Sequence, residues 1–181
     1  MEKELIALCA PTLARLKTGS LFRVRMKDTG EWFSQFRKLA YQLRGKGVQM
    51  TILQIKDGHA LLYVYRKERL QQDMACPKVA AFLALWGYHG SVNHIIRQLR
   101  HRVAEQEEFP HEIGFFLGYP FEDVAGFIRH QGKNCKCAGC WKVYGDEEYA
   151  KRLFQKYEKC RLVYMRLWQT GTPLQRLAVA G

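Results

Sequence analysis

The chain has 181 residues, of which 48% are hydrophobic and 25% are charged, so it is long enough to bury a core and has the composition of a globular protein. This composition excludes a disordered, collagen-like or coiled-coil chain, and no apolar run reaches the roughly 20 residues of a membrane-spanning helix. The net charge of +12 favours an acidic partner, such as nucleic acid, an anionic membrane surface or an acidic protein. The N-terminus carries Glu2 and Glu4 and lacks a signal-peptide pattern, so we expect a cytoplasmic protein with reduced thiols.

The first half of the chain predicts helices around a β-hairpin. Apolar residues at helical spacing predict a helix over 3–17, with Pro11 as a break or kink. Two β-rich runs, 48–55 and 59–66, flank Asp57 and Gly58, and an Asp-Gly pair between such runs is a strong hairpin signal. The other expected elements of this half are a strand at 21–26 and helices at 31–44, 66–74, 77–86 and 92–105.

The second half is less regular. The apolar run 112–119 predicts a buried strand, and Pro120 opens a short helix. Residues 140–145 predict another strand, after which Asp146 caps a helix. The run 161–168 is ambiguous between helix and strand.

Helices that alternate irregularly with strands favour an α+β fold, in which helices pack on a mostly antiparallel sheet. An α/β arrangement with a mixed sheet is the alternative. Because no linker or low-complexity stretch divides the chain, we expect a single domain over residues 1–181.

A series of short motifs runs through residues 110–144. Pro110-His111-Glu112 leads into Ile113-Gly114, and the series continues with Phe-Leu-Gly-Tyr-Pro at 116–120, Glu-Asp-Val at 122–124, Gly-Phe-Ile at 126–128 and Trp-Lys-Val-Tyr at 141–144. These motifs, together with the opening of the chain, resemble a family of small bacterial proteins, found largely in anaerobes, that is known only as a domain of unknown function. The resemblance covers most of the chain.

This resemblance implies no established activity or ligand. Members of the family are often encoded near flavodoxin-like and ferrous-iron-transport proteins, which implies a role in redox or iron metabolism. The resemblance therefore makes an acidic, flavodoxin-like protein a candidate partner for this basic chain.

Four cysteines form the first candidate site. Cys135, Cys137 and Cys140 lie close together in the sequence, and Cys160 could supply a fourth thiolate to zinc or iron. We expect nearby lysines to lower the pKa of these thiols. However, zinc sites of this kind normally combine two Cys-x2-Cys pairs. Here Cys137 and Cys140 form one pair, and Cys160 is the single cysteine available in place of the second. The alternative is three loop thiols and one packed cysteine.

His111 and Glu112 form the second candidate site, as a pair that could act in acid–base catalysis. Adjacent residues on a strand point to opposite faces, however, so the alternative is a turn in which either side chain is bonded to backbone or to an arginine.

Two functions from different classes remain open at this level. The first is an accessory protein of redox or iron metabolism that docks an acidic partner and uses residues 110–144 as a ligand, metal or thiol site. The second is a nucleic-acid-binding module, favoured by the net charge and by the basic helix expected at 92–105. No phosphate loop, dinucleotide fingerprint, nucleophile elbow or zinc-protease motif is present, so the sequence leaves open whether the protein is an enzyme.

Overall fold

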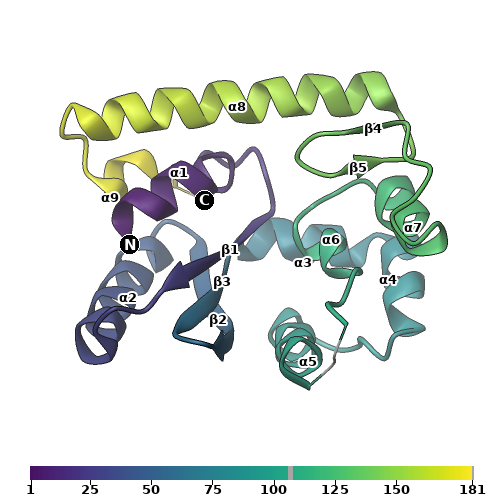
Figure 1. Cartoon of the computed structure of the whole chain (residues 1–181), viewed down its shortest axis with the longest axis horizontal. Coiled ribbons are helices and arrows are strands. Elements are labelled where there is room, and N and C mark those ends of the chain that lie inside the picture. Colours follow the sequence, from purple (N-terminus) through teal and green to yellow (C-terminus); the bar gives the residue numbers. More distant parts are fainter. Residues whose placement is uncertain (106–107, 181) are drawn as a thin grey trace.

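The structure, a computed structural model, describes residues 1–105 and 108–180. Its elements follow the chain in this order: α1 (Glu2–Leu13), β1 (Gly19–Arg25), α2 (Thr29–Arg44), β2 (Val48–Lys56), β3 (His59–Arg66), α3 (Lys67–Ala75), α4 (Pro77–Ala84), α5 (Val92–Glu105), α6 (Ile113–Phe116), α7 (Phe121–Arg129), β4 (Cys137–Ala138), β5 (Lys142–Val143), α8 (Glu147–Gln169) and α9 (Leu174–Leu177). Helices packed on a small antiparallel sheet confirm the α+β prediction (Figure 1). Within the described ranges, no helix combines the length and the apolar character that a bilayer crossing requires.

The main sheet has the order β1-β3-β2, and both pairs of strands are antiparallel. The turn between β2 and β3 is the Asp57-Gly58 pair that the sequence predicted. Both residues have positive φ angles, 51° and 69°, as a two-residue turn of type I′ requires. This turn sets the register in which Lys56 pairs with His59.

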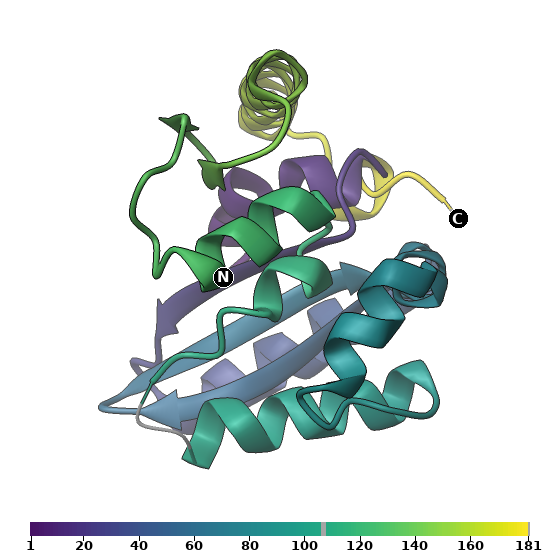
Figure 2. The same ribbon diagram turned by 90° about the vertical axis from the view of Figure 1, so that its right-hand side faces the viewer.

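The central strand β3 is buried on both faces, so the sheet lies between helices on either side (Figure 2). Leu61, Tyr63 and Tyr65 pack in one cluster with side chains of α3, α4, α5, α6 and α7. Leu62 and Val64 point the other way and pack with α1, α2 and α9. The alternation of side chains along a strand therefore divides the core into two layers.

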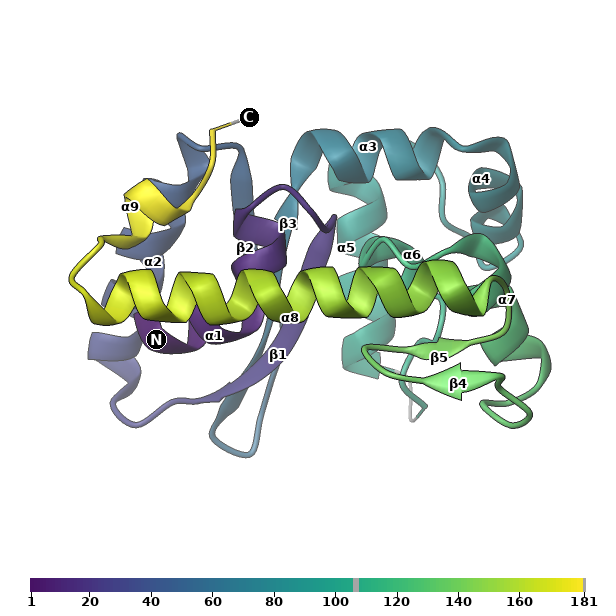
Figure 3. The same cartoon turned by 90° about the horizontal axis from the view of Figure 1, so that it is seen from above.

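The helix α8 is 23 residues long and crosses the length of the molecule (Figures 1 and 3). Asp146 caps its start, as predicted, by accepting a hydrogen bond from the Tyr149 amide at 2.9 Å. Its C-terminal half packs on α1 through Tyr164, Met165 and Trp168. Near its start, Ala150 and Tyr157 pack with Trp141 and Val143 of the hairpin formed by β4 and β5. The ambiguous run 161–168 is thus helical.

The strand predicted at 112–119 is wrong, because residues Ile113–Phe116 form the short helix α6. Ile113, Phe115 and Phe116 are all buried, so this helical turn is apolar on every side. A short apolar run of that kind has no periodicity by which a strand could be distinguished from a buried helix. The strand predicted at 140–145 is also shorter than expected, since only Lys142–Val143 pair with β4.

Candidate ligand-binding site

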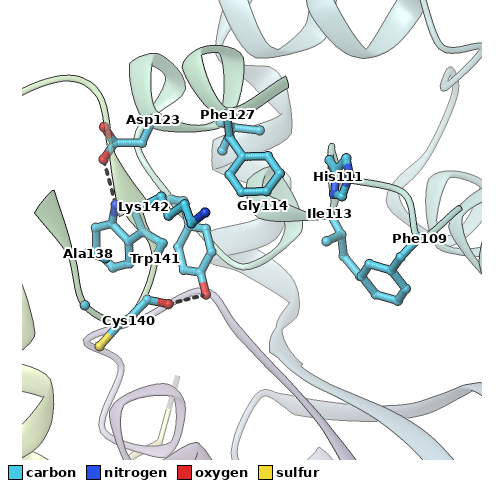
Figure 4. Close-up of a pocket in the computed structure, with 13 residues that line it drawn as sticks. Phe109, His111, Ile113, Gly114, Asp123, Phe127, Ala138, Cys140, Trp141 and Lys142 are labelled. Carbon is cyan, nitrogen blue, oxygen red and sulfur yellow. Dashed lines mark hydrogen bonds between the residues drawn. The ribbon is translucent and has the colours of Figure 1, made fainter. Parts of the chain in front are cut away.

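A cavity of about 400 Å³ lies where α6 and α7 face the hairpin of β4 and β5 (Figure 4). Its lining combines residues from the loop before α6, from the two helices and from the hairpin: Phe109, His111, Ile113, Gly114, Tyr119, Asp123, Val124, Phe127, Ala138, Gly139, Cys140, Trp141 and Lys142. His111, Ala138 and Lys142 are exposed, so the cavity opens to solvent between the loop and the hairpin. Its volume lies within the roughly 300–1,000 Å³ typical of small-molecule sites.

Aromatic and aliphatic side chains form the walls. Trp141 is held on both sides, because it stacks on Tyr119 with ring centroids 4.6 Å apart and meets the edge of Phe154 at 4.5 Å. Phe127 lies on the α7 side of the cavity, and Phe109 lies with His111 on the loop side (Figure 4). Gly114 and Gly139 complete the lining, so the cavity presents mainly apolar surface to a ligand.

Asp123 fastens the hairpin to α7. One carboxylate oxygen accepts the indole N–H of Trp141 at 2.6 Å, and the other accepts the backbone amides of Tyr144 and Gly145 at 2.7 and 2.8 Å. The residue is only 2% exposed, so its carboxylate has lost its hydrogen bonds to water, and these three donors compensate for that loss. Asp123 thereby sets the position of the Trp141 wall.

The structure places His111 and Glu112 in different surroundings. The His111 ring lines the cavity and contacts the Phe127 ring, with centroids 4.9 Å apart. Glu112 is 1% exposed and accepts hydrogen bonds from Arg102 at 2.7 Å and from Tyr88 at 3.0 Å. The bond to an arginine is the alternative that the sequence left open. A catalytic role for this pair stays a prediction, and the geometry brings only His111 to the cavity.

Two lysines carry positive charge close to the cavity. Lys142 lines it, where its Nζ donates to the Gly132 carbonyl at 2.7 Å and lies 5.9 Å from the centroid of the Phe127 ring. Lys17 lies behind the wall, with its Nζ 5.0 Å from the centroid of the Tyr119 ring. Burial lowers the pKa of Lys17, and the nearby thiols of Cys140 and Cys9 oppose that shift.

The four cysteines proposed as ligands for zinc or iron are not brought together as a metal centre. Cys135 and Cys137 are half-buried around the start of the hairpin, Cys140 is exposed and lines the cavity, and Cys160 is half-buried on α8. Across residues 1–105 and 108–180, no group of three or more histidine, cysteine or acidic side chains is arranged to hold a metal ion.

The expectation that lysines lower the thiol pKa values is wrong for three of these cysteines. Burial raises the pKa of Cys160 to about 11 and also raises that of Cys137. Burial likewise raises the pKa of Cys140, although the charge of Lys17 opposes the shift. Because the thiolate is the nucleophilic form of cysteine, a raised pKa makes these three side chains less reactive as nucleophiles at neutral pH.

The segment 110–144, which the sequence analysis favoured as a ligand, metal or thiol site, supplies all the residues that line the cavity except Phe109. The sequence did not indicate that Asp123, Phe127 and Trp141 in particular face one cavity. Asp123 follows Pro120 at the start of a helix, where an acidic residue has an ordinary explanation in the helix dipole. Its actual partners lie 18 to 22 positions further along the chain, and no local pattern announces such contacts.

The fold and the site together define an α+β protein with an open, aromatic-walled cavity of a size suited to a small molecule. A family model described as protein of unknown function (DUF3793) matches residues 5–178. The chain therefore belongs to this family, which confirms the resemblance to a family of unknown function. No curated protein and no solved structure matches the chain.

Proposed function

We propose that this protein binds a small, flat and mainly apolar molecule that carries an acidic group, in the cavity between α7 and the hairpin. One observation carries this proposal: the cavity of about 400 Å³ is walled by aromatic rings and has Lys142 at its lining. Tyr119 and Phe154 already pack on Trp141. A bound apolar ring would therefore contact the edge of Trp141 and the rings of Phe109 and Phe127. A lysine ammonium on one wall favours a negative charge on the ligand.

The polar groups around the cavity support this choice of ligand. His111 offers ring nitrogens that can hydrogen-bond a bound polar group. The carboxylate of Asp123 already accepts three hydrogen bonds on its two oxygens, so it offers little to a ligand donor. Among the charged and imidazole side chains of the lining, His111 and Lys142 therefore remain open to a ligand, at the exposed side of the cavity.

Anilinonaphthalene sulfonate tests the proposal, because this fluorescent probe is flat, aromatic and anionic. The probe is titrated into the wild-type protein and into Ala138→Phe, which places a large ring in the cavity from an exposed position. We expect saturable binding to the wild type and an affinity lowered by about 10-fold or more in the variant, since the same space is filled. Equal binding to both proteins contradicts the proposal.

We further propose, from the family resemblance, that the protein is a cytoplasmic accessory of redox or iron metabolism and binds an acidic, flavodoxin-like protein. The net charge of +12 supports an acidic partner, because opposite charges speed and orient docking. The test is binding to a purified flavodoxin over a series of salt concentrations. Binding that weakens as salt rises is expected, and no binding at low salt contradicts this partner.

A nucleic-acid-binding role is the second candidate. Its support is the basic exposed surface of α5, where Arg97 and Arg100 lie one turn apart. Binding to a short DNA duplex or RNA, with log affinity falling linearly against log salt, is the expected result for this role. Flavodoxin binding without nucleic-acid binding argues against it.

A further inference from the structure

No helix or strand within residues 1–105 and 108–180 covers the outer face of α8. A helix of 23 residues is about 35 Å long, and α8 runs across one face of the molecule, at the top in Figure 1 and nearest the viewer in Figure 3. One of its faces packs on α1 and the hairpin through side chains that include Tyr157, Tyr164 and Trp168. The opposite face consists of exposed side chains.

Four cations lie on this opposite face. They are Arg152, Lys156, Lys159 and Arg166, and all are exposed. Their spacing of four, three and seven residues places them on one side of a helix. The acidic residues of α8 are paired elsewhere: Glu147 and Glu148 with Lys151, and Glu158 with Arg161. In the described part of the chain, none of the four cations forms an ion pair, so their charge faces outward unopposed.

Three aliphatic side chains lie among these cations on the C-terminal half of the helix. Leu162, Val163 and Leu167 are 55%, 47% and 41% exposed. At about 3.6 residues per turn, Lys159 and Arg166 lie between Leu162 on one side of this face and Val163 and Leu167 on the other. Exposed aliphatic side chains next to charged groups are found at protein interfaces, which combine apolar and polar contacts.

We propose that the outer face of α8, residues 152–167, docks an acidic protein that presents an aliphatic patch within its acidic surface. The four cations would meet carboxylates of the partner and steer its approach. Leu162, Val163 and Leu167 would pack against the partner's apolar patch. Removing this apolar surface from water would contribute favourable binding free energy. This inference rests on the proposal that the partner is an acidic protein, and it does not depend on the cavity.

Two other acidic surfaces fit this face less well. Nucleic acid gains nothing from exposed leucine and valine. The aromatic ring that α8 exposes, that of Tyr149 at 47%, lies one turn before Arg152, and one ring does not form a platform on which successive bases could stack. An anionic membrane attracts the cations, but helices that lie in a bilayer surface bury a broad apolar face, whereas α8 exposes three aliphatic side chains and packs its main apolar face on the protein. The mixture of charge and a small apolar patch favours a protein.

Matched charge reversals test the proposal, with a purified flavodoxin as the acidic probe. Lys156→Glu/Lys159→Glu changes the net charge by the same amount as Arg97→Glu/Arg100→Glu on α5, and all four positions are exposed. We expect the α8 variant to lose about 10-fold or more in affinity, and the α5 variant to lose about 3-fold or less through its long-range effect alone. If the α8 and α5 variants lose the same affinity, the assignment of the docking surface to α8 is overturned, but the proposal of an acidic protein partner is not. No binding by the wild type overturns both.

A second pair of variants tests the apolar contact. Leu162→Gln removes an aliphatic side chain from this face, and Leu85→Gln removes one that is 83% exposed elsewhere. Weaker flavodoxin binding is expected from the first substitution only. A short DNA duplex and vesicles containing phosphatidylserine are measured alongside. If either of these binds more tightly than flavodoxin and loses affinity in the α8 charge reversal but not in Leu162→Gln, the partner is not a protein and the proposal is overturned.

Discussion

The carboxylate of Asp123 accepts the indole N–H of Trp141 at 2.6 Å, inside the protein and across 18 positions of the chain. The same carboxylate accepts two backbone amides of the hairpin, so a single side chain on α7 holds the opposite wall of the cavity. Buried hydrogen bonds to a charged acceptor are among the stronger ones, because the donors lack water as an alternative. The shape of the proposed site therefore depends on Asp123.

Asp123→Asn is expected to destabilise the protein by about 2 kcal/mol or more, because an amide offers one acceptor oxygen where three donors now converge. The measurement is the free energy of unfolding in urea. Asp146→Asn is the matched control, since Asn is as good an N-cap for α8 as Asp and should change stability by only a few tenths of a kcal/mol. An Asp123→Asn protein as stable as the control would show that the network is dispensable.

Neighbouring residues 111 and 112 should respond very differently to substitution. Glu112→Gln is expected to cost about 2 kcal/mol or more, because it leaves Arg102 beside a buried neutral group. His111→Ala should change stability by less than about 0.5 kcal/mol, since its ring is exposed. Unfolding in urea measures both. Equal stability losses would contradict the division into a buried structural residue and an exposed cavity residue.

Gly126→Ala in α7 should destabilise the protein, although alanine normally stabilises a helix by about 1 kcal/mol relative to glycine. A Cβ at this position would come within 2.5 Å of the Tyr144 Cβ, which is attached directly to the backbone and cannot rotate away. Gly45→Ala is the control, because nothing lies within 4 Å of its Cβ position and its φ is −63°.

We expect Gly126→Ala to lower the melting temperature, and Gly45→Ala to leave it unchanged or raise it slightly. A rise in both variants would show that the hairpin does not pack on α7 as described.

Lys142→Gln should weaken binding of anilinonaphthalene sulfonate by about 3- to 5-fold, with the loss disappearing at high salt, because one partly exposed charge is removed. Lys136→Gln is a closely matched control. Lys136 also donates to a glycine carbonyl, that of Gly145, and it belongs to the same loop and hairpin segment, but it does not line the cavity. The same loss in both variants would mean that the charge acts at long range rather than in the cavity.

Cys160 should react slowly with iodoacetamide at pH 8, because burial raises its pKa to about 11. At that pH the thiolate fraction is about 100-fold lower than for a solvent-exposed thiol with the ordinary pKa of 9.0. As the pH rises from 9 toward 11, the unfolded thiol ionises before the folded one, so this group makes the folded state less stable.

Mass spectrometry of the labelled protein compares Cys160 with the exposed Cys76. Faster labelling of Cys160 than of Cys76 at pH 8 would contradict the burial of its thiol and would restore it as a candidate for thiol chemistry.

Local patterns in the sequence predicted the elements whose causes are local. The Asp57-Gly58 turn and the Asp146 cap are examples, because turn and cap chemistry is set by a few adjacent residues. The short helix α6 was missed, since an apolar run without polar interruptions shows no period. For the cavity, the sequence favoured the segment 110–144 but did not show which of its side chains meet. The contacts of Asp123 span 18 to 22 positions, and an acidic residue in the first turn of a helix already has a local explanation in the helix dipole.

The most direct test of the proposed ligand site observes the indole N–H groups by NMR during a titration with anilinonaphthalene sulfonate. The chain has four tryptophans, and Trp141 is the one among them that lines this cavity, so its resonance can be assigned from Trp141→Phe. Binding in the cavity predicts a saturable shift of the Trp141 resonance, while the resonance of Trp32, buried against α1 and β1 in the other layer of the core, stays in place. Binding that leaves the Trp141 resonance unmoved would contradict the account.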